Sequence, residues 1–327
     1  MQTSGTPPMT SGTPHVAAIV NPRSGGGRTG RGWRVISETL ERELGPIRAH
    51  FTTGGSTPRY LPAADLTRNA LKEGAQLVVA VGGDGTINEV VNGFFEDGRL
   101  INPHAHLAVL NTGTGGDFRK TFDLPEELEP CVARIAEGTT RTIDIGRMSF
   151  VADDGREAMR FFDNIASFGM SGAVDRAVNR AQISKLFGGS FAFLWATLVT
   201  AIRFRPQAVR LTADTGFDDI INIGTAAVAN GRFFGGGMMI APKAEPDSGY
   251  FDIVILRHTT LGDLLSGSRA LYDGTHLDDP KVTHFRAKWL VATPVAEAPV
   301  LLDIDGEAPG RLPARFEILP SVLTLRC

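Results

Sequence analysis

The sequence predicts an α/β domain with a mostly parallel sheet, followed by an antiparallel β-sandwich domain. Its 327 residues are enough for two domains. Apolar strands and amphipathic helices alternate from His15 to about Asp144. This alternation is typical of a three-layer arrangement, in which helices cover both faces of a parallel sheet. Short strands then follow one another to the end of the chain, which favours an antiparallel sandwich.

The elements of the first domain are predicted from the length and spacing of their apolar residues. Short continuous apolar runs predict strands, and apolar residues at helical spacing predict helices. In chain order the expected elements are strand 16–20, helix 33–44, strand 47–51, helix 61–72, strand 76–81, helix 87–95, strand 106–110 and helix 125–138.

The second domain is predicted as a series of strands interrupted by one helical stretch, which runs from about 175 to 204. A change of composition near 144–160 marks the boundary, so we expect the α/β domain at 15–144 and the sandwich at 145–315. The strands are expected at 159–167, 208–214, 221–230, 250–257, 284–293, 299–307 and 316–326.

Composition and the chain start narrow the class of protein. Residues 1–14 contain TSGTP twice and are expected to form a disordered tail, without the charged and apolar regions of a secretory signal. Cys131 and Cys327 show neither metal-ligand nor disulfide spacing, which favours a reducing cytoplasm. A formal net charge of −3 gives no field for nucleic acid, so we expect no nucleic-acid partner.

The segment VVAVGGDGTINEVVNG, Val78–Gly93, is the most informative part of the chain. A buried strand leads through Gly82, Gly83 and Gly85 into a helix that starts near Thr86. Such a turn offers backbone N–H groups and a positive helix end to a phosphate. Asp84 stands among these glycines and would repel phosphate unless it holds a cation or takes a proton. The loop therefore predicts a site where a phosphoryl group is transferred.

Two other strand ends are also rich in glycine or hydroxyl side chains. NPRSGGGRTGR, Asn21–Arg31, follows the first strand, and NTGTGGDF, Asn111–Phe118, ends the fourth. In a parallel sheet the ligand crevice lies outside the carboxyl ends of the strands. We therefore expect all three loops to border one site, with phosphate or ribose contacts from Asn21 and Ser24.

Three interpretations of the first loop compete with a phosphate contact. Gly25, Gly27 and Gly30 spell a dinucleotide-binding GxGxxG, but the second strand ends without the acid that this motif requires. A P-loop is nearly spelled as well, although Arg31 stands at the lysine position and Gly32 at the Ser/Thr position. A flexible glycine-rich turn is the simplest of the three.

Six sequence blocks in one order carry a family resemblance: NPRSG, GGDGTINEVVNG, GTGGDF, NGRFFGGG, APKAEPDSG, and DGE followed by FEILPSVL. The chain resembles the diacylglycerol kinase catalytic family and is most similar to its soluble bacterial lipid kinases, which are relatives of sphingosine and ceramide kinases. GGDGT alone is shared with NAD kinases and 6-phosphofructokinases. The resemblance covers nearly everything from His15 to Arg326.

The resemblance implies an NAD kinase-like first domain, to which the final strand at 316–327 returns. It implies Glu307 as the proton acceptor with Asp305 beside it, while Asp84 serves the metal or the hydroxyl. It also implies ATP and Mg²⁺ as cofactors. The implied nucleotide-binding residues are Asn21, Pro22, Arg23, Ser24, Gly25, Thr52, Gly82, Gly83, Asp84, Gly85, Thr86, Ile87, Asn88 and Thr114.

Two positions depart from the family pattern. Gly116 replaces the asparagine of GT-x-N-D-F, and Ser248 replaces the second aspartate of a block that helps a structural magnesium network. The weak metal set that remains is Glu245, Asp247, Ser248 and Tyr250.

The function implied is an ATP-dependent lipid kinase that phosphorylates a lipid hydroxyl. Diacylglycerol, converted to phosphatidic acid, is the leading acceptor, and ceramide or a sphingoid base could take its place. Two further hypotheses are an NAD kinase-like enzyme and a non-catalytic lipid-binding pseudokinase. Asp-Gly of DGE is also a strong hairpin-turn signal, so this segment could be structural.

The chain is expected to act at a membrane surface without crossing it. The stretch 186–202 has seventeen uncharged residues between Lys185 and Arg203, at the lower limit for a span. It suits a buried core helix or a helix beside a lipid pocket. We expect peripheral membrane association in the cytoplasm, as a monomer or homodimer.

Overall fold

The computed structural model describes residues 15–53, 61–173, 204–257 and 269–327. The predicted tail at 1–14 and the apolar stretch at 186–202 lie outside the described residues. Across the described ranges, no helix is long and apolar enough to cross a membrane.

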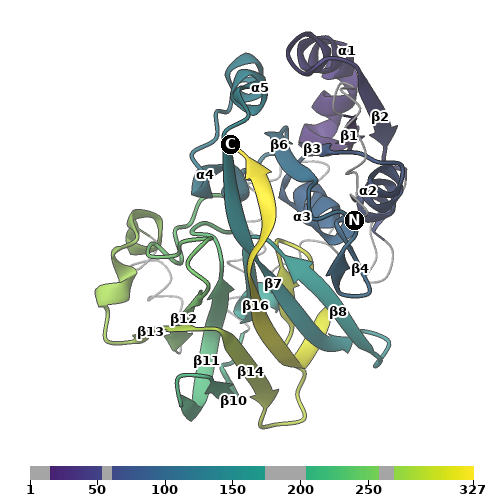
Figure 1. The fold of residues 1–327 in the computed structure, drawn as a ribbon. Coiled ribbons are helices and arrows are strands. Elements are labelled where there is room, and N and C mark those ends of the chain that lie inside the picture. Colours follow the sequence, from purple (N-terminus) through teal and green to yellow (C-terminus); the bar gives the residue numbers. More distant parts are fainter. Residues whose placement is uncertain (1–14, 54–60, 174–203, 258–268) are drawn as a thin grey trace, which may run out of the picture.

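The first region is a three-layer α/β unit. Its parallel sheet has the order β6-β3-β1-β2. Helices α1 and α5 pack on one face of this sheet, and α2 and α3 pack on the other (Figure 1). Each pair of helices covers one buried apolar cluster. The elements are β1 (Val16–Val20), α1 (Ser24–Leu44), β2 (Ile47–Phe51), α2 (Pro62–Lys72), β3 (Leu77–Gly82), α3 (Asp84–Gly93), β4 (Phe95–Glu96), β5 (Arg99–Leu100), β6 (His106–Asn111), α4 (Asp117–Thr121) and α5 (Leu128–Glu137).

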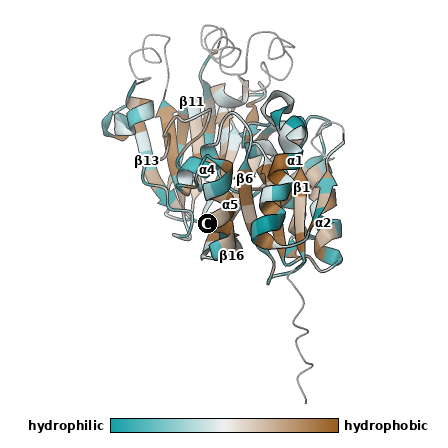
Figure 2. Cartoon of the chain, turned by 90° about the horizontal axis from the view of Figure 1, so that it is seen from above, coloured by the Kyte–Doolittle hydropathy of each residue, from teal (hydrophilic) through white to brown (hydrophobic). Residues whose placement is uncertain are grey.

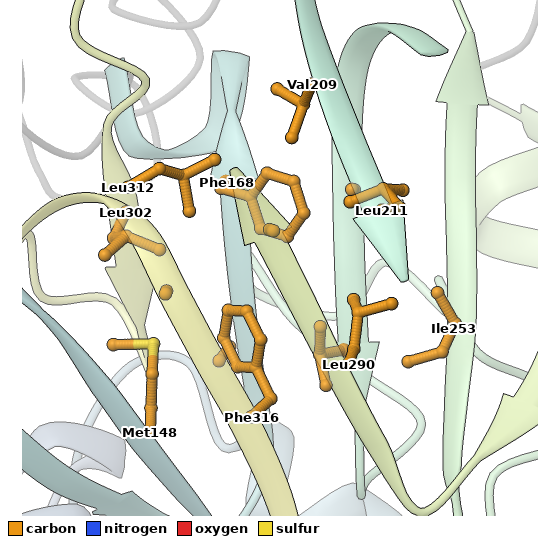
Figure 3. Close-up of a cluster of buried hydrophobic side chains, with 14 of the residues drawn as sticks. Met148, Phe168, Val209, Leu211, Ile253, Leu290, Leu302, Leu312 and Phe316 are labelled. Atoms are coloured by element: carbon orange, nitrogen blue, oxygen red, sulfur yellow. The ribbon is translucent and has the colours of Figure 1, made fainter. Parts of the chain in front are cut away.

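The second region is antiparallel, as predicted. Its strands are β8 (Glu157–Phe162), β9 (Ile165–Gly169), β10 (Gln207–Ala213), β11 (Asp218–Ala229), β12 (Phe251–Arg257), β13 (Val282–Ala287), β14 (Trp289–Pro294) and β15 (Leu302–Ile304), with a 3₁₀ turn, η1 (Thr275–Asp278). Aromatic side chains fill its core: Phe162 stacks on Phe251 and Phe168 on Phe316, with ring centroids 5.4 and 5.9 Å apart. Figure 3 shows Phe168 and Phe316 among the aliphatic side chains of this cluster.

Two long strands join the regions. β7 (Thr140–Ala152) pairs antiparallel with β16 (Gly310–Arg326) along most of its length. The last residues of β16, Thr324–Arg326, pair parallel with β6, so the chain end lies beside the first sheet (Figure 1). The two regions therefore share one continuous sheet, and the expected boundary at 144–145 falls inside β7.

Sequence periodicity placed most elements but not all of them. The strand β7 was not predicted, because its residues alternate between buried and exposed only in part. The single strand expected at 284–293 is two strands, because β13 pairs with β12 whereas β14 pairs with β10 and β16. The strand predicted at 299–307 is only the short β15, since the chain turns at Asp305.

Figure 2 shows why these elements pack as they do. The strands are mostly hydrophobic, whereas the outward sides of the helices are polar. Val16–Val20 and Leu77–Gly82 are buried throughout, as expected for central strands covered on both faces. The polar loops are thereby left at the strand ends, where the site is built.

Candidate active site

The loop after β1 is tied to the neighbouring strand and helix. The Asn21 backbone N–H donates to the Val81 carbonyl at 2.9 Å, and its side-chain Nδ2 donates to Thr86 Oγ1 at 3.0 Å. The next residues, Gly25, Gly26 and Gly27, all have positive φ, at 58, 68 and 82°. This is the left-handed region that glycine adopts without steric cost. These glycines therefore interrupt the helical conformation near the start of α1, and the regular part of the helix follows Gly27.

The loop after β3 leads directly into α3. Gly82 has no room for a side chain, because an added Cβ would lie 2.5 Å from the Thr86 Cβ. Gly83 is extended and serves as the N-cap, and α3 begins at Asp84. The first turn of a helix carries backbone N–H groups without intrahelical partners and a partial positive charge. This helix end is suited to bind an anion.

The loop after β6 packs against both of the others. A Cβ on Gly113 would lie 2.5 Å from the Gly83 Cα, and a Cβ on Gly25 would lie 2.5 Å from the Thr112 carbonyl oxygen. Thr29 Oγ1 donates to Thr112 Oγ1 at 2.6 Å. The three glycine-rich loops thus meet at the carboxyl ends of β1, β3 and β6. Their close approach explains why glycine occupies these positions.

Asp84 holds the third loop in place. Its Oδ2 accepts the backbone N–H of Gly116 at 2.9 Å, and its Oδ1 accepts that of Phe118 at 3.2 Å. Gly116 has a φ of +67°, and asparagine is among the residues that tolerate this conformation best. The departure from the family's asparagine therefore preserves the backbone conformation.

Asp117 extends this network to the second region. It is 6% exposed and accepts the backbone N–H of Gly236 at 2.8 Å, with Lys120 Nζ at 3.4 Å. Burial raises the pKa of Asp117, the Gly236 hydrogen bond opposes that rise, and the nearby charge of Asp84 adds to it. Asp117 was not among the site residues predicted from the sequence.

The buried face of α3 binds the second region as well. Asn92 forms two hydrogen bonds with the backbone of Phe161 in β8, one to its carbonyl at 2.9 Å and one from its N–H at 3.0 Å. Asn88 donates to Asp305 Oδ2 at 2.7 Å and to the Phe161 carbonyl at 3.1 Å. Their spacing of four residues places both on one helix face, a signal that the sequence carried. Glu89 accepts the backbone N–H of Ala63 at the start of α2.

The DGE segment is a hairpin turn that also presents a carboxylate. Ile304 and Glu307 exchange both backbone hydrogen bonds, at 2.8 and 2.9 Å. Asp305 and Gly306 between them have φ values of 47 and 85°, the positive pair expected of Asp-Gly in a two-residue turn. The turn interpretation and the functional interpretation of DGE are therefore compatible.

Glu307 reaches the first turn of α3 from the second region. A Cβ placed on Gly85 in the first turn of α3 would lie 3.8 Å from Glu307 Oε1. The other oxygen, Oε2, accepts a hydrogen bond from Arg160 Nη1 at 2.7 Å. The Arg160 side chain is 3% exposed, against 29% for Glu307. The carboxylate is thus held between a buried guanidinium and the start of α3.

The structure separates the sequence-predicted nucleotide residues into two groups. The first group belongs to the three converging loops and consists of Asn21, Pro22, Arg23, Ser24, Gly25, Gly82–Thr86 and Thr114. Thr52 lies beside the first of these loops, because its backbone N–H donates to the carbonyl of Val20 at the end of β1. The other group faces inward: the Ile87 side chain lies in the core, and the Asn88 amide binds the second region. Any ligand contact from these two residues is therefore limited to the backbone.

The residues predicted as metal ligands have other partners. Asp247 is paired with Arg141 through two hydrogen bonds of 2.9 and 2.8 Å, and this lowers the pKa of Asp247. Ser248 Oγ donates to the Tyr250 carbonyl, and Glu245 lies 3.8 Å from the Arg286 guanidinium. Among the described residues, no group of three His, Cys, Asp or Glu side chains is placed to hold a metal ion. The metal role of Glu245, Asp247, Ser248 and Tyr250 therefore stays a prediction.

The fold combines a parallel sheet that carries three converging glycine-rich loops with a second, antiparallel region, an arrangement suited to a phosphotransferase. Residues 15–148 match the family model described as "Diacylglycerol kinase catalytic domain". Residues 164–327 match the family model described as "YegS C-terminal NAD kinase beta sandwich-like domain". The chain therefore belongs to the diacylglycerol kinase family of lipid kinases, whose members use ATP to phosphorylate an alcohol group.

Similar proteins support the same assignment. The chain is 28% identical over 313 residues to a diacylglycerol kinase of Mycobacterium tuberculosis, covering 94% of this chain and 93% of the relative. It is 28% identical over 273 residues to a diacylglycerol kinase of Staphylococcus carnosus, covering 82% of each. A crystal structure of a diacylglycerol kinase from Bacillus anthracis shares the fold, with a TM-score of 0.66 at 20% identity and coverage of 95% of this chain and 96% of that one.

Proposed function

We propose that this lipid kinase transfers the γ-phosphate of ATP to the free hydroxyl of diacylglycerol and releases phosphatidic acid. One observation carries the proposal. The Glu307 carboxylate from the second region faces Gly85, in the first turn of the helix that ends the central glycine loop. A phosphate-binding helix end and a proton acceptor are the two groups that phosphoryl transfer to an alcohol requires close together.

The phosphates are proposed to bind where the three loops meet. The start of α3 supplies N–H groups and a positive dipole end, and the glycines of the first loop carry no side chain that would block a ligand. Asn21 supports this arrangement, because its amide links the first loop to Thr86. The proposed nucleotide contacts are Asn21–Gly25, Thr52, Gly82–Thr86 and Thr114.

Mg²⁺ is part of the proposal, and Asp84 is the residue that would hold it. Each Asp84 oxygen accepts one backbone N–H from the third loop. A carboxylate oxygen has two lone pairs, so each oxygen retains one for a further partner. Bound Mg²⁺ would neutralise charge on the transferring phosphoryl group. It keeps most of its ligands as phosphate oxygens and water, so one or two carboxylates suffice.

Glu307 is proposed to accept the proton of the lipid hydroxyl. Arg160 binds Oε2, which leaves Oε1 directed toward the start of α3. A positioned base of this kind contributes roughly 10²–10⁴-fold to the rate. Asp305 is proposed to support the turn, since its two oxygens already accept the Asn88 amide and the Ile165 backbone N–H.

The acceptor and nucleotide roles are tested together with purified protein and labelled ATP. Diacylglycerol, ceramide and sphingosine are offered in separate detergent micelles, and NAD is offered in solution. We expect label in phosphatidic acid only when Mg²⁺ is present. Label only in NAD would replace the proposal with an NAD kinase, and label in none of the four would indicate a non-catalytic lipid-binding protein.

A matched pair of variants tests the proton acceptor. Glu307→Gln is expected to lower kcat by at least about 10²-fold with little change in ATP affinity, because the base acts as the proton leaves. Glu297→Gln changes an exposed glutamate and is expected to keep the wild-type rate. A wild-type kcat for Glu307→Gln would remove Glu307 from the mechanism and leave Asp84 as the candidate base.

We also propose that the protein docks peripherally on the membrane that holds its lipid. Supporting this, no described helix is long and apolar enough to cross a membrane. Cell membranes containing the protein would be washed with high salt and with carbonate. Release into the wash is expected, whereas retention in the carbonate-washed pellet would contradict peripheral binding.

A further inference from the structure

Two carboxyl groups, Asp305 of the DGE turn and Asp163 next to it, form a pair outside the three glycine-rich loops. Asp163 follows β8 and is 2% exposed. Its side chain is hydrogen bonded to the side chain of Asp305 in the turn. A hydrogen bond between two carboxyl groups requires a proton on one of them, and two adjacent buried carboxylates do not both ionise. The pair therefore carries one proton that a surface aspartate would have lost.

The surroundings place this proton on Asp163. Both Asp305 oxygens accept strong donors, the Asn88 amide at 2.7 Å and the Ile165 backbone N–H at 2.8 Å, which favour its charged form. Asp163 has a weaker neighbour in the Asn88 amide, at 3.4 Å. Burial raises the pKa of Asp305 to about 6, and burial together with the charge of Asp305 raises the pKa of Asp163 well above its ordinary value.

The pair connects the proton acceptor to the helix of the nucleotide site. Asp305 is two residues before Glu307 in the same turn and is bound by Asn88 of α3. Asn88 is four residues from Asp84, at the other end of the same helical turn. The contacts among Asp163, Asp305 and Asn88 therefore fix the position of the DGE turn relative to α3.

We propose that Asp163 is a positioning residue for the transfer reaction: as a neutral acid it donates to Asp305 and so fixes the turn that directs Glu307 toward the start of α3. The inference rests on the proposed role of Glu307. Asp163 itself is 2% exposed, so its side chain is not placed to touch a substrate directly. It acts only through the turn, so its effect is confined to steps in which Glu307 takes part.

The first test compares two replacements of nearly equal size. Asp163→Asn retains a side-chain N–H that can donate to Asp305, as the protonated acid does. Asp163→Leu removes the donor. At a temperature where both variants are folded, we expect Asp163→Asn to keep kcat within about threefold and Asp163→Leu to lose at least about tenfold in kcat with little change in KM for ATP. Equal losses in the two variants, or a wild-type kcat for Asp163→Leu, would overturn the proposal.

The second test is a double-mutant cycle with Glu307→Gln. A residue that acts through Glu307 has nothing left to position once the base is gone. Asp163→Leu is therefore expected to slow the wild-type enzyme but to leave the residual rate of Glu307→Gln within about twofold. Independent, multiplying losses would show that Asp163 only stabilises the fold. A wild-type rate for Glu307→Gln alone would instead contradict the proposed role of Glu307. The two failures are therefore distinguishable, because the first test changes only Asp163.

Discussion

The contact between the second and third glycine loops can be tested by adding a single methyl group. Gly113 approaches Gly83 so closely that a Cβ on Gly113 would lie 2.5 Å from the Gly83 Cα. Unbonded carbon atoms normally rest about 3.5–4.0 Å apart, so Gly113→Ala must separate the two loops by about 1 Å. Both partners are backbone atoms, and neither can relieve the clash by changing a rotamer.

The expected cost follows from this displacement. Overpacking of this kind costs about 1–3 kcal/mol, which lowers Tm by about 2–5 °C for a chain of this length. The displaced atoms belong to the loops proposed to hold the phosphates. A misplacement of about 1 Å can cost about 10²-fold in rate, so we expect kcat/KM for ATP to fall by about 10–10²-fold.

Gly32→Ala is the matched control. Gly32 lies within α1, and an added Cβ would meet nothing within 4 Å. Alanine in a helix interior is favoured over glycine by about 0.5–1 kcal/mol, so Tm should stay constant or rise slightly with unchanged kinetics. The assays are thermal unfolding and steady-state kinetics with varied ATP. Wild-type Tm and kcat/KM for Gly113→Ala would refute the inference that the loops are held in contact.

Three other predictions follow from buried polar groups. Asn92→Ala removes both hydrogen bonds to Phe161 and should lower the free energy of unfolding by about 2–4 kcal/mol, measured by urea denaturation; a loss below about 0.5 kcal/mol would show that α3 and β8 are not joined there. Burial raises the pKa of the Cys131 thiol to about 11, so alkylation at about pH 8 should modify it only in unfolded protein, as read by mass spectrometry; rapid labelling of the native protein would contradict this burial. The raised pKa of Asp305, about 6, means that the native state binds more protons than the unfolded state above about pH 4, so this pair costs stability as the pH rises toward 6. Asp163→Asn removes one titrating group, and its unfolding free energy should fall less than that of the wild type between about pH 4 and pH 7; parallel pH curves would show that the pair does not share a proton.

Much of the fold could be predicted because it depends on residue patterns that are local in the sequence. The strands at 16–20 and 106–110 follow from short apolar runs, the strand at 47–51 from alternating apolar and polar residues, and helix 61–72 from its apolar periodicity. Asp-Gly at 305–306 predicted a tight turn through its backbone preference, and the structure has that turn. Each of these signals is contained in a window of about ten residues or fewer.

Other features depend on which strands become neighbours. The residues 284–293 look like one strand, but Lys288 separates β13 and β14, which pair with different partners. The seventeen residues of β16 pair with β7 along most of their length, and they also pair first with β14 and then with β6. A register shift between Leu319 and Leu323 accompanies the passage from one region to the other. Pairing of this kind is decided by global packing, which no local window contains.

By itself the sequence determined the class of protein, the three glycine-rich loops and the candidate carboxylates Asp84 and Glu307. Only the tertiary structure decided what each polar side chain binds. The Asn88 side chain donates to Asp305, which lies 217 positions away. Arg160 of β8 and Asp163, which directly follows that strand, contact the DGE turn through Glu307 and Asp305. Glycine and apolar periodicity act on the local backbone and are visible in sequence, whereas the partner of a buried polar group is set by long-range packing that must satisfy every such group.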